Sequence, residues 1–467
     1  MNAPRFVNPA TVGKDLLSRY ATQGPRYTSY PTAPHFFPEV DREALVSRYR
    51  QSNAKTGRER DLSLYVHVPF CRRRCAFCGC FTEITHDPAQ TDPFLAAVEA
   101  ELRLALTRID PSRPLRQLAL GGGSPSFLDP ARLDRLLSAI VSHFTFTSDA
   151  ERSIEIDPRA IVPAQLDVLF AHGFNRFSLG VQDFDEEVLE KAGRPQGFEL
   201  SAALVERLHQ AGQRAINFDF IYGLPGQTPE SMARTVDRAL ALGPSRVALY
   251  GYAHVPWMRP HQKALERHGI PGPEERLALF GAAFERYVGA GFEPVGMDHF
   301  ARPDDDLAQA QRARTLHRNF MGYTTHRGLD LLALGPSAIS AVGDTYAQNT
   351  KDLDFYVGAA LSGQAVIERG FILGEEDRMR RELIIDLFCN FALDGEAFGA
   401  RFGVDFLGHF KDELKRLQPM QDDGLLNVEG ARFDVTPLGR VFIRNICMVF
   451  DRYLEAESRE KRYSQTV

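Results

Sequence analysis

Three cysteines with a tight spacing, Cys71-x3-Cys75-x2-Cys78, are the residues of this sequence with the clearest chemical purpose. Thiolates hold iron–sulfur clusters, and a cubane normally takes four of them. A loop with only three leaves one iron open to a ligand from outside the protein, as catalytic metal centres generally require. Cys80 follows closely, so a structural zinc site with four thiolates is the competing interpretation. Because all four lie on one short segment rather than in two separated pairs, iron–sulfur chemistry is favoured.

A glycine-rich segment, GGGSPSFL at 121–128, lies between a predicted strand and a predicted helix. Glycine lets backbone amides approach a ligand closely, and the start of a helix favours anionic groups. Many turns between a strand and a helix are rich in glycine for structural reasons alone, so this segment by itself leaves both interpretations open. Its position one strand after the cysteines favours ligand binding.

Two carboxylates, Glu155 and Asp219, lie inside segments that are otherwise apolar. A buried carboxylate is costly unless it is paired or hydrogen-bonded. The sequence leaves two partners open: a basic residue on a neighbouring helix, or a ligand such as a ribose hydroxyl or an ammonium group inside the fold. Gln182 and Arg194 extend the same polar set.

A run of three arginines at 72–74 lies between the first two cysteines of the motif. A charge run is usually a solvated surface, and the alternative is a docking site for an acidic electron donor, since complementary charge steers such encounters. Cys389 and Cys447 lie in apolar, helical segments, where free cysteines behave as small hydrophobes. We therefore assign them no role, and we expect the lone Trp257 to lie in the core rather than at a cofactor.

The elements that must position these residues alternate between strands and helices. Apolar runs rich in β-branched or aromatic residues predict strands, and segments with helical spacing lie between them. The predicted strands are 62–68, 115–120, 153–157, 176–181, 216–222 and 246–252, with 329–335 as an additional strand, and the clearest helices are 93–106 and 131–144. This alternation predicts parallel strands with helical crossovers. Six units are fewer than the eight of a complete barrel, so the fold is a partial barrel or a doubly wound sheet.

The unusual residues gather just after the predicted strands. The cysteines follow the first strand, the glycine-rich segment follows the second, Asp157 ends the third, Gln182 follows the fourth and 223–226 follows the fifth. In a barrel of parallel strands the loops at the carboxyl ends form the active-site face. The sequence therefore predicts one site at this face.

Composition sets the wider limits. The chain has 467 residues, 44% of them hydrophobic and 25% charged, with a net charge of -6. These values fit a globular protein of two or three domains and argue against a general nucleic-acid binder. No segment has the length of uninterrupted apolar residues that a membrane helix needs, and the N-terminus is unlike a secretory signal, so we expect a cytoplasmic protein without a membrane anchor.

Three domains are predicted. Residues 1–55 form an N-terminal arm and helix, residues 56–365 the barrel with its added strand, and residues 366–467 a helical C-terminal domain, whose first helix lies within 375–393. The arm includes the extended segment 24–36, which is rich in proline and tyrosine.

The cysteine spacing, preceded by a strand and with an aromatic before the last cysteine, is the signature of the radical S-adenosylmethionine (SAM) superfamily. Within it, several segments resemble the oxygen-independent coproporphyrinogen III oxidases, and together they span nearly the whole chain. These segments are 25–33, 65–80, 121–128, 153–159, 179–185, 217–228, 252–257, 317–325, 335–340 and 444–451. The resemblance implies a partial (β/α)6 TIM-like barrel with an N-terminal arm and a mainly α-helical C-terminal domain.

The resemblance also implies the cofactors and their ligands. A [4Fe-4S] cluster would be held by Cys71, Cys75 and Cys78, whereas Cys80 is typical of the family without being a ligand. Two SAM molecules would bind near the cluster. The matching contacts to the first are Tyr65, Gly122, Glu155 and Ile339. The matching contacts to the second are Phe77, Gly123, Ser124, Gln182, Arg194, Asp219 and Ala253.

The implied reaction converts two propionate side chains of coproporphyrinogen III into vinyl groups, giving protoporphyrinogen IX in haem biosynthesis. Reductive cleavage of SAM would supply a 5′-deoxyadenosyl radical that abstracts hydrogen from the propionate. A one-electron donor such as a flavodoxin or a ferredoxin is implied, and we expect a monomer. Arg26, on the arm that would close over the substrate, is our expected partner for a propionate.

The nearest competing function is that of a paralogue which binds and delivers haem. That branch of the superfamily is expected to lack both the arm at 25–33 and the cysteine at position 80, and this chain has both.

Overall fold

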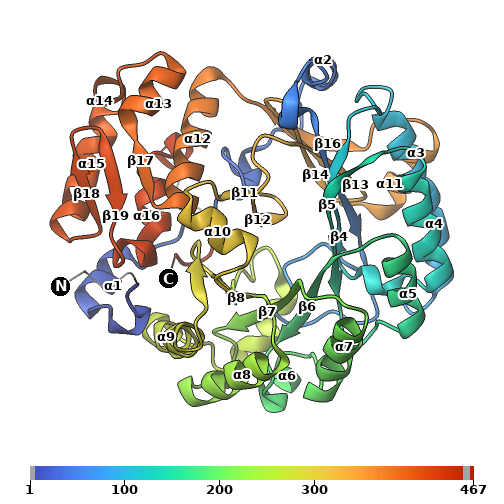
Figure 1. The fold of residues 1–467 in the computed structure, drawn as a ribbon, viewed down its shortest axis with the longest axis horizontal. Coiled ribbons are helices and arrows are strands. Elements are labelled where there is room, and N and C mark those ends of the chain that lie inside the picture. The colour runs from blue at the N-terminus through green and yellow to red at the C-terminus, as the bar shows by residue number, and fades with distance from the viewer. Residues whose placement is uncertain (1–5, 456–462, 467) are drawn as a thin grey trace.

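A curved sheet of twelve strands dominates the computed structural model, which describes residues 6–455 and 463–466 (Figure 1). Seven neighbouring strands run parallel, and each is apolar on the side facing the outer helices. In spatial order the parallel strands are β13 (Asp330–Leu334), β1 (Leu62–Val68), β4 (Leu115–Gly122), β5 (Phe146–Ile156), β6 (Arg176–Gln182), β7 (Ile216–Tyr222) and β8 (Arg246–Gly251). The six predicted strands and the additional strand are therefore confirmed, and the partial barrel is the correct alternative.

Short antiparallel strands extend both sides of this parallel region. One side continues with β14 (Ile339–Val342), β15 (Thr345–Asn349) and β16 (Ile367–Ile372), and the other with β10 (His299–Ala301) and β9 (Glu293–Val295). The sequence did not predict them, because short strands without helical crossovers lack the alternation that marked the others. Since β16 pairs with β15, the sheet continues to Ile372, past the boundary that we expected between residues 365 and 366.

Helices cover the outer, convex side of the sheet (Figure 1). They are α3 (Thr91–Ala105), α4 (Pro130–Val141), α5 (Pro163–Ala171), α6 (Glu186–Lys191), α7 (Phe198–Gln210), α8 (Pro229–Leu242), α9 (Pro273–Gly289) and α11 (Leu353–Leu361). The short helix α10 (Asp306–Arg312) lies instead toward the C-terminal domain (Figure 1), and its Leu307 lines the cavity inside the sheet. In α4 the Asp129 side chain accepts the backbone N–H of Arg132 and caps the first turn. Leu133, Leu137 and Ile140, spaced as one helix face, are buried against the sheet.

The C-terminal domain packs beside the open side of the sheet and is mainly helical, as the resemblance implied (Figure 1). It also contains a small three-stranded antiparallel sheet that the sequence did not predict. Its helices are α12 (Glu375–Asn390), α13 (Gly395–Phe402), α14 (Phe406–His409), α15 (Lys411–Asp422), α16 (Ile443–Met448) and α17 (Arg452–Glu455), and its strands β17 (Ala392–Asp394), β18 (Leu426–Glu429) and β19 (Arg432–Val435). Cys389 and Cys447 are fully buried in its core, as expected.

A hairpin of β11 (His317–Asn319) and β12 (Gly322–Thr324) lies between this domain and the sheet (Figure 1). Its tip contributes to the cavity inside the curved sheet. The open side of the partial barrel is thus closed by a hairpin rather than by further strands of the sheet.

The N-terminal arm links the C-terminal domain to the barrel. Helices α1 (Lys14–Tyr20) and α2 (Arg42–Ser52) flank the extended segment, whose Tyr27 and Tyr30 side chains are almost fully buried. The Tyr27 hydroxyl donates to Asp451 of the C-terminal domain, and Arg26 donates to the backbone oxygen of Gly251 at the end of β8. The arm is therefore a packed part of the fold.

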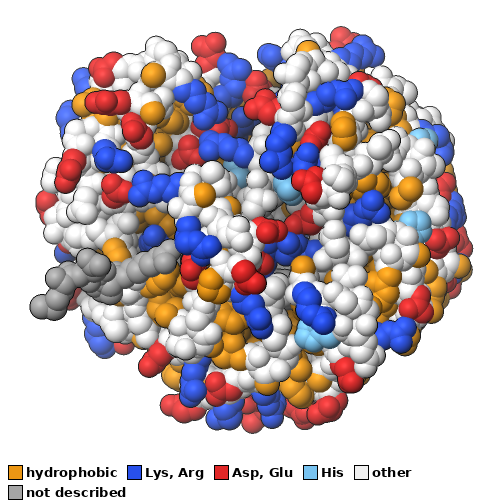
Figure 2. Space-filling model, viewed as in Figure 1, with side chains coloured by type: hydrophobic (Ala, Val, Ile, Leu, Met, Phe, Trp, Pro, Cys, Tyr) orange, Lys and Arg blue, Asp and Glu red, His pale blue; other side chains and the backbone are white. Residues whose placement is uncertain are grey.

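Two surface features complete the description. No helix in the described parts of the chain is long and apolar enough to cross a membrane. Acidic and basic side chains are interspersed over the face shown in Figure 2, as a small net charge predicts. Trp257 is 44% exposed, so our expectation of a core tryptophan was wrong; it lies on the loop after β8 rather than on a core-facing element.

Candidate active site

A cavity of about 550 Å³ occupies the inside of the curved sheet. Side chains alternate between the two faces of a strand, so every second residue points inward. On β5 the inward positions hold Glu151, Ser153 and Glu155, while Ile154 and Ile156 belong to the hydrophobic core. Complete barrels of parallel strands fill these inward positions with large branched side chains. Here small and polar side chains replace them, which leaves the cavity.

Many of the residues expected from the sequence meet at the upper end of this cavity, where the parallel strands end. The cavity is lined there by Tyr65, Phe77, Cys78, Glu155, Gln182, Asp219 and Ala253. They come from five strands and their loops, so the predicted convergence at the carboxyl ends is observed. The cavity lining does not include the other expected residues, which are Gly122, Gly123, Ser124, Arg194, Cys71 and Cys75. Ile339 lies on β14, where it packs against the cluster around Phe36.

The cysteine loop is held in place from two sides. Its start forms a short parallel pair, β2 (Phe70–Cys71) with β3 (Glu83–Ile84), and the backbone N–H of Ala76 donates to Ala192 at 2.9 Å. From the other side the segment after β8 binds the end of the loop through backbone oxygens. His261 contacts the oxygen of Cys78 at 2.8 Å, and Arg259 donates to that of Gly79 at 2.9 Å. Hydrogen bonds from two sides therefore define the shape of the loop.

Two guanidinium groups point at the buried thiol of Cys75. Arg194 Nη1 lies 3.6 Å from Cys75 Sγ, and Arg159 Nη2 lies 3.9 Å from it. Both arginines are also paired with Asp157, which ends β5, at 3.1 Å and 2.7 Å respectively. Burial opposes the ionisation of Asp157, but Arg194 and Arg159 outweigh it and lower its pKa. The two guanidinium groups and Asp157 thus fix the surroundings of the Cys75 sulfur.

The other thiols lie in contrasting environments. The hydrogen bond from Cys80 lowers the pKa of Cys78 to about 6, whereas burial raises the pKa of Cys71 to about 12. In residues 6–455 and 463–466 no three Cys, His, Asp or Glu side chains are placed to hold one metal ion. A cubane takes each thiolate on a different iron, so three thiols spaced along one loop are compatible with the cluster that the sequence favours.

The glycine-rich turn brings backbone amides to Glu155. The N–H of Gly122 donates to Glu155 Oε2 at 3.1 Å. Gly122 has a φ of +116°, which residues with side chains rarely adopt, and a Cβ on Gly123 would lie 2.5 Å from the backbone oxygen of Pro69. The hydroxyl of Ser124 is buried and has no hydrogen-bond partner in the described structure. Such an orphaned group is rare and is readily explained by a ligand that supplies the partner.

Glu155 and Asp219 form no ion pair with a basic residue in the described parts of the chain, so the expected alternative of a basic partner on a neighbouring helix is not observed. Asp219 accepts hydrogen bonds from Ser178 at 2.6 Å and Asn217 at 3.0 Å. The Glu155 side chain is exposed to the cavity, and protein surrounds the cavity itself. Enclosure and the nearby charge of Asp219 raise the pKa of Glu155 to about 7.

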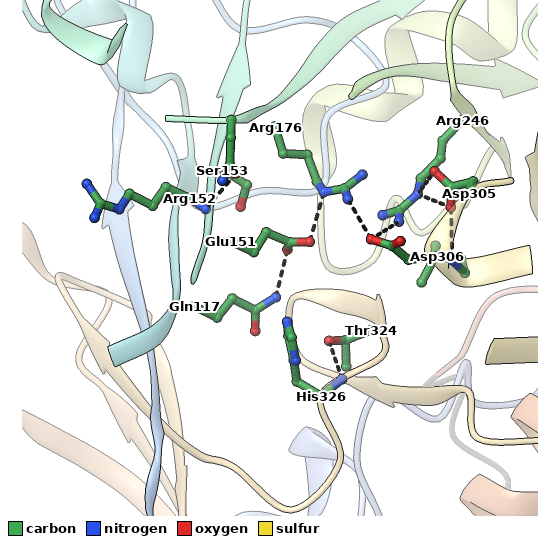
Figure 3. Close-up of polar contacts among 12 residues, drawn as sticks. Gln117, Glu151, Arg152, Ser153, Arg176, Arg246, Asp305, Asp306, Thr324 and His326 are labelled. Atoms are coloured by element: carbon green, nitrogen blue, oxygen red, sulfur yellow. Dashed lines mark hydrogen bonds and ion pairs between the residues drawn. The ribbon is translucent and has the colours of Figure 1, made fainter. Parts of the chain in front are cut away.

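Figure 3 shows a different arrangement at the lower end of the cavity, where the strands begin. Glu151 accepts from Arg176 Nε at 2.8 Å and from Gln117 Nε2 at 2.9 Å. Arg246 donates to Asp305 at 2.6 Å. Burial opposes the ionisation of Glu151, but the charges of Arg176 and Arg246 lower its pKa. These side chains form a floor of ion pairs that closes the cavity.

Sequence reasoning missed this floor and the hairpin residues 319–324. One sequence feature could have predicted the floor. Arg176 and Arg246 are each the first residue of a predicted strand, and they lie on the same inward face as later polar residues of that strand. The hairpin had none beyond its resemblance to the family. Arg26, expected to bind a propionate, does line the cavity.

Comparisons with known proteins agree with this geometry. The model of the Radical SAM superfamily matches residues 65–239, and that of the HemN C-terminal domain matches residues 373–442. Oxygen-independent coproporphyrinogen III oxidase of Escherichia coli (strain K12) is 42% identical over 97% of this chain and 98% of its own length. The protein of the same name from Helicobacter pylori (strain J99) is 38% identical over 98% of this chain and 100% of its own length.

One solved structure is similar along the whole chain. It is described as "Coproporphyrinogen III oxidase (HemN) from Escherichia coli is a Radical SAM enzyme". It is 41% identical, covers 95% of this chain and 99% of its own length, and has a TM-score of 0.87.

Proposed function

The chain belongs to the oxygen-independent coproporphyrinogen III oxidases of the radical SAM superfamily. On that premise we propose which of its residues bind the cofactors and which bind the substrate. The reaction is the oxidative decarboxylation of two propionates of coproporphyrinogen III to vinyl groups. The observation that carries this function is similarity along the whole chain, combined with a cysteine loop that opens directly onto an internal cavity. A [4Fe-4S] cluster and SAM are the cofactors of the superfamily.

When bound, the cluster supplies the electron that cleaves SAM into methionine and a 5′-deoxyadenosyl radical, which is strong enough to abstract hydrogen from an unactivated carbon. We assign its ligands to Cys71, Cys75 and Cys78. The contacts of Arg159 and Arg194 with the Cys75 sulfur support this assignment, because donors around the sulfur are what a cluster-bound thiolate needs. Cys80 hydrogen-bonds Cys78 and is left out of the ligand set.

We assign SAM to the upper half of the cavity, in two molecules as the resemblance implies. Glu155, Tyr65 and Gly122 would face the first, together with Ile339, which packs near Phe320 in the cavity wall. The ribose hydroxyls and the ammonium group of SAM are donors, and a carboxylate at Glu155 accepts from either. The remaining contacts, which would face the second molecule, are Phe77, Gly123, Ser124, Gln182, Arg194, Asp219 and Ala253.

We place the substrate between SAM and the floor, with Arg26 as the partner of one propionate. Arg26 donates only to a backbone oxygen, and no carboxylate of the described chain lies within ion-pair distance of it. Burial lowers its pKa, so a carboxylate ligand would stabilise its charge. The floor and the packed arm exclude water, which protects a reactive radical from side reactions.

An anaerobic assay tests this function directly. Reconstituted protein is mixed with dithionite, SAM and coproporphyrinogen III, and products are separated by mass. We expect loss of two carbon dioxide units per substrate and formation of protoporphyrinogen IX. Tight haem binding without turnover would instead support the delivery function of the paralogous branch.

Two further assignments complete the proposal. We expect a monomer that takes single electrons from a flavodoxin or a ferredoxin. All six cysteines are free thiols, which the reducing cytoplasm would preserve.

A further inference from the structure

Four basic side chains from separate segments surround the place where the cysteine loop reaches the surface. Arg74 belongs to the loop itself and donates to the backbone oxygen of Thr82 at 2.9 Å. Arg259 comes from the segment after β8 and holds Gly79. Lys351 and Arg369 lie at the neighbouring ends of β15 and β16, where Asn349 pairs with Ile367. We call Arg74, Arg259, Lys351 and Arg369 the basic rim.

Their charges act on one another, which shows that they are close in space. Arg74 and Arg259 both bind the cysteine segment through backbone oxygens, those of Thr82 and Gly79. Burial and the charges of Arg369 and Arg259 lower the pKa of Lys351, against a smaller opposing effect of Glu368. The basic rim therefore extends from the cysteine loop to the edge of the sheet formed by β15 and β16.

The basic rim differs from most arginines of this chain in having no acidic partner. Elsewhere, arginines such as Arg132, Arg246 and Arg327 are paired with one or two carboxylates. No side chain of the rim forms an ion pair within 4.0 Å among the described residues, and the nearest acid is Glu368, which accepts the backbone N–H of Lys351 at 3.2 Å. One acid, Glu368, offsets only part of the charge of these four cations, and an acidic partner would relieve the remaining repulsion.

Large apolar side chains lie beside the rim. Trp257 and Met258 directly precede Arg259 and are 44% and 55% exposed. Tryptophan, methionine and arginine are the residue types enriched in protein interfaces, and aromatic anchors among them carry much of the binding energy. A small anionic ligand would need the cations but not two exposed apolar side chains. The combination therefore fits a protein partner better than the entry of a small molecule.

We propose that the basic rim, with Trp257 and Met258, is the docking surface for an acidic one-electron carrier protein. This inference rests on the proposed function, because only a reductive reaction at the cysteine loop needs such a partner. The reduced carrier would lose one electron, and the iron–sulfur cluster that we assign to Cys71, Cys75 and Cys78 would gain it. His261 and Arg259 contact both the surface segment and the cysteine loop, so the surface and the electron's destination are joined through a short path.

The test compares two electron sources on the complete, cluster-loaded enzyme under anaerobic conditions. Stopped-flow absorbance follows cluster reduction either by a reduced acidic flavodoxin or by dithionite, which needs no protein interface. The variants are Lys351→Glu and Trp257→Ala, neither of which alters a residue that we place at the cofactors. Lys411→Glu, at an exposed lysine at the start of α15 in the C-terminal domain, is the matched control.

For wild type we expect reduction by flavodoxin to slow as salt is added, because salt screens complementary charges. Lys351→Glu should slow it about tenfold at low salt and flatten the salt dependence, since steering charges act mainly on association. Trp257→Ala should slow it at every salt concentration. Reduction by dithionite should be the same for all four proteins.

Unchanged reduction by flavodoxin in both variants would overturn the docking surface. A raised KM for coproporphyrinogen III with unchanged flavodoxin kinetics would also overturn it and assign the rim to substrate entry. Failure of the proposed function looks different, because then dithionite would reduce the cluster but no vinyl product would form even in wild type.

Discussion

Glu151 and Glu155 lie four residues apart on β5, on the same inward face, yet the structure treats their carboxylates in opposite ways. At the lower end of the cavity, Glu151 is paired with Arg176 and hydrogen-bonded by Gln117, and its pKa is lowered (Figure 3). At the upper end, Glu155 has a backbone amide of Gly122 as its hydrogen-bond donor and its pKa is raised to about 7.

The different partners of the two carboxylates indicate different roles. Residues such as Glu151 stabilise the fold, whereas residues such as Glu155 are available to bind a ligand. A buried charge with good partners adds little beyond its own desolvation, but removing one partner is costly. A carboxylate held near an acidic neighbour without a counter-charge stores unfavourable energy that a ligand with donors can relieve. The floor should therefore respond to mutation mainly in stability, and the upper end mainly in binding and turnover.

The largest expected effect is at the upper end, in Cys75→Ser. Loss of one of three thiolate ligands should abolish the cluster's absorbance and SAM cleavage together. Iron content and the visible spectrum of anaerobically reconstituted protein check this. Cys389→Ser, which replaces a buried thiol far from the site, should retain both; a fully active Cys75→Ser protein would refute the ligand assignment.

Glu155→Gln tests whether the carboxylate at the upper end of the cavity binds SAM. Loss of a charged acceptor should weaken SAM binding roughly 10- to 100-fold, as measured by calorimetry on the anaerobic protein. Because the substitution also removes repulsion with Asp219, the thermal midpoint of the SAM-free protein should stay equal or rise. A clear loss of stability would mean that Glu155 belongs with the floor.

Glu151→Gln is the matching change at the floor. Arg176 would keep a hydrogen-bond acceptor but lose its charged partner, so unfolding free energy should fall by about 2 kcal/mol in urea titrations. Since the pKa of Glu151 is lowered in the folded state, this contribution is present above pH 5 and is lost as pH falls below about 4. The affinity for SAM should hardly change. A large loss of SAM affinity would contradict the idea that the floor stabilises the fold without binding the ligand.

The smallest expected effect is in pH dependence. With a pKa of about 7, Glu155 is mostly ionised at pH 8 and mostly protonated at pH 6, so SAM affinity should fall about tenfold between them. Glu155→Gln should lack that component. The sign for stability is opposite: a raised acid pKa means that the folded SAM-free protein binds the proton more tightly, so its stability decreases as pH rises from about 5 to 7. Identical pH profiles for wild type and variant would show that another group is responsible.

Much of this could be predicted from the sequence. The six strands and the added strand carried local signals in their apolar runs, and the cysteine loop carried its own spacing, so the arrangement of strands and helices followed without any knowledge of distant contacts. The carboxyl-end rule for parallel sheets predicted that the cysteines, the glycine-rich segment and Gln182 would gather at one face, whereas the partners of Glu155 and Asp219 stayed open.

Other features depend on contacts between distant segments. The antiparallel strands β9, β10 and β14 to β16 are three to six residues long and become strands because they pair with an existing sheet edge. Trp257 was expected in the core, and only its loop position exposes it. The floor joins Arg246 at the start of β8 to Asp305 beside α10, a pairing that no local pattern indicates.

By itself, the sequence determined which residues carry chemistry and which segments form the parallel strands, because spacing, polarity and side-chain period are local properties. The tertiary structure alone decided which of two carboxylates on one strand has a counter-charge. That outcome depends on the curvature of the sheet, which brings Arg176 and Arg246 to one end of the cavity and leaves a second acid, Asp219, at the other.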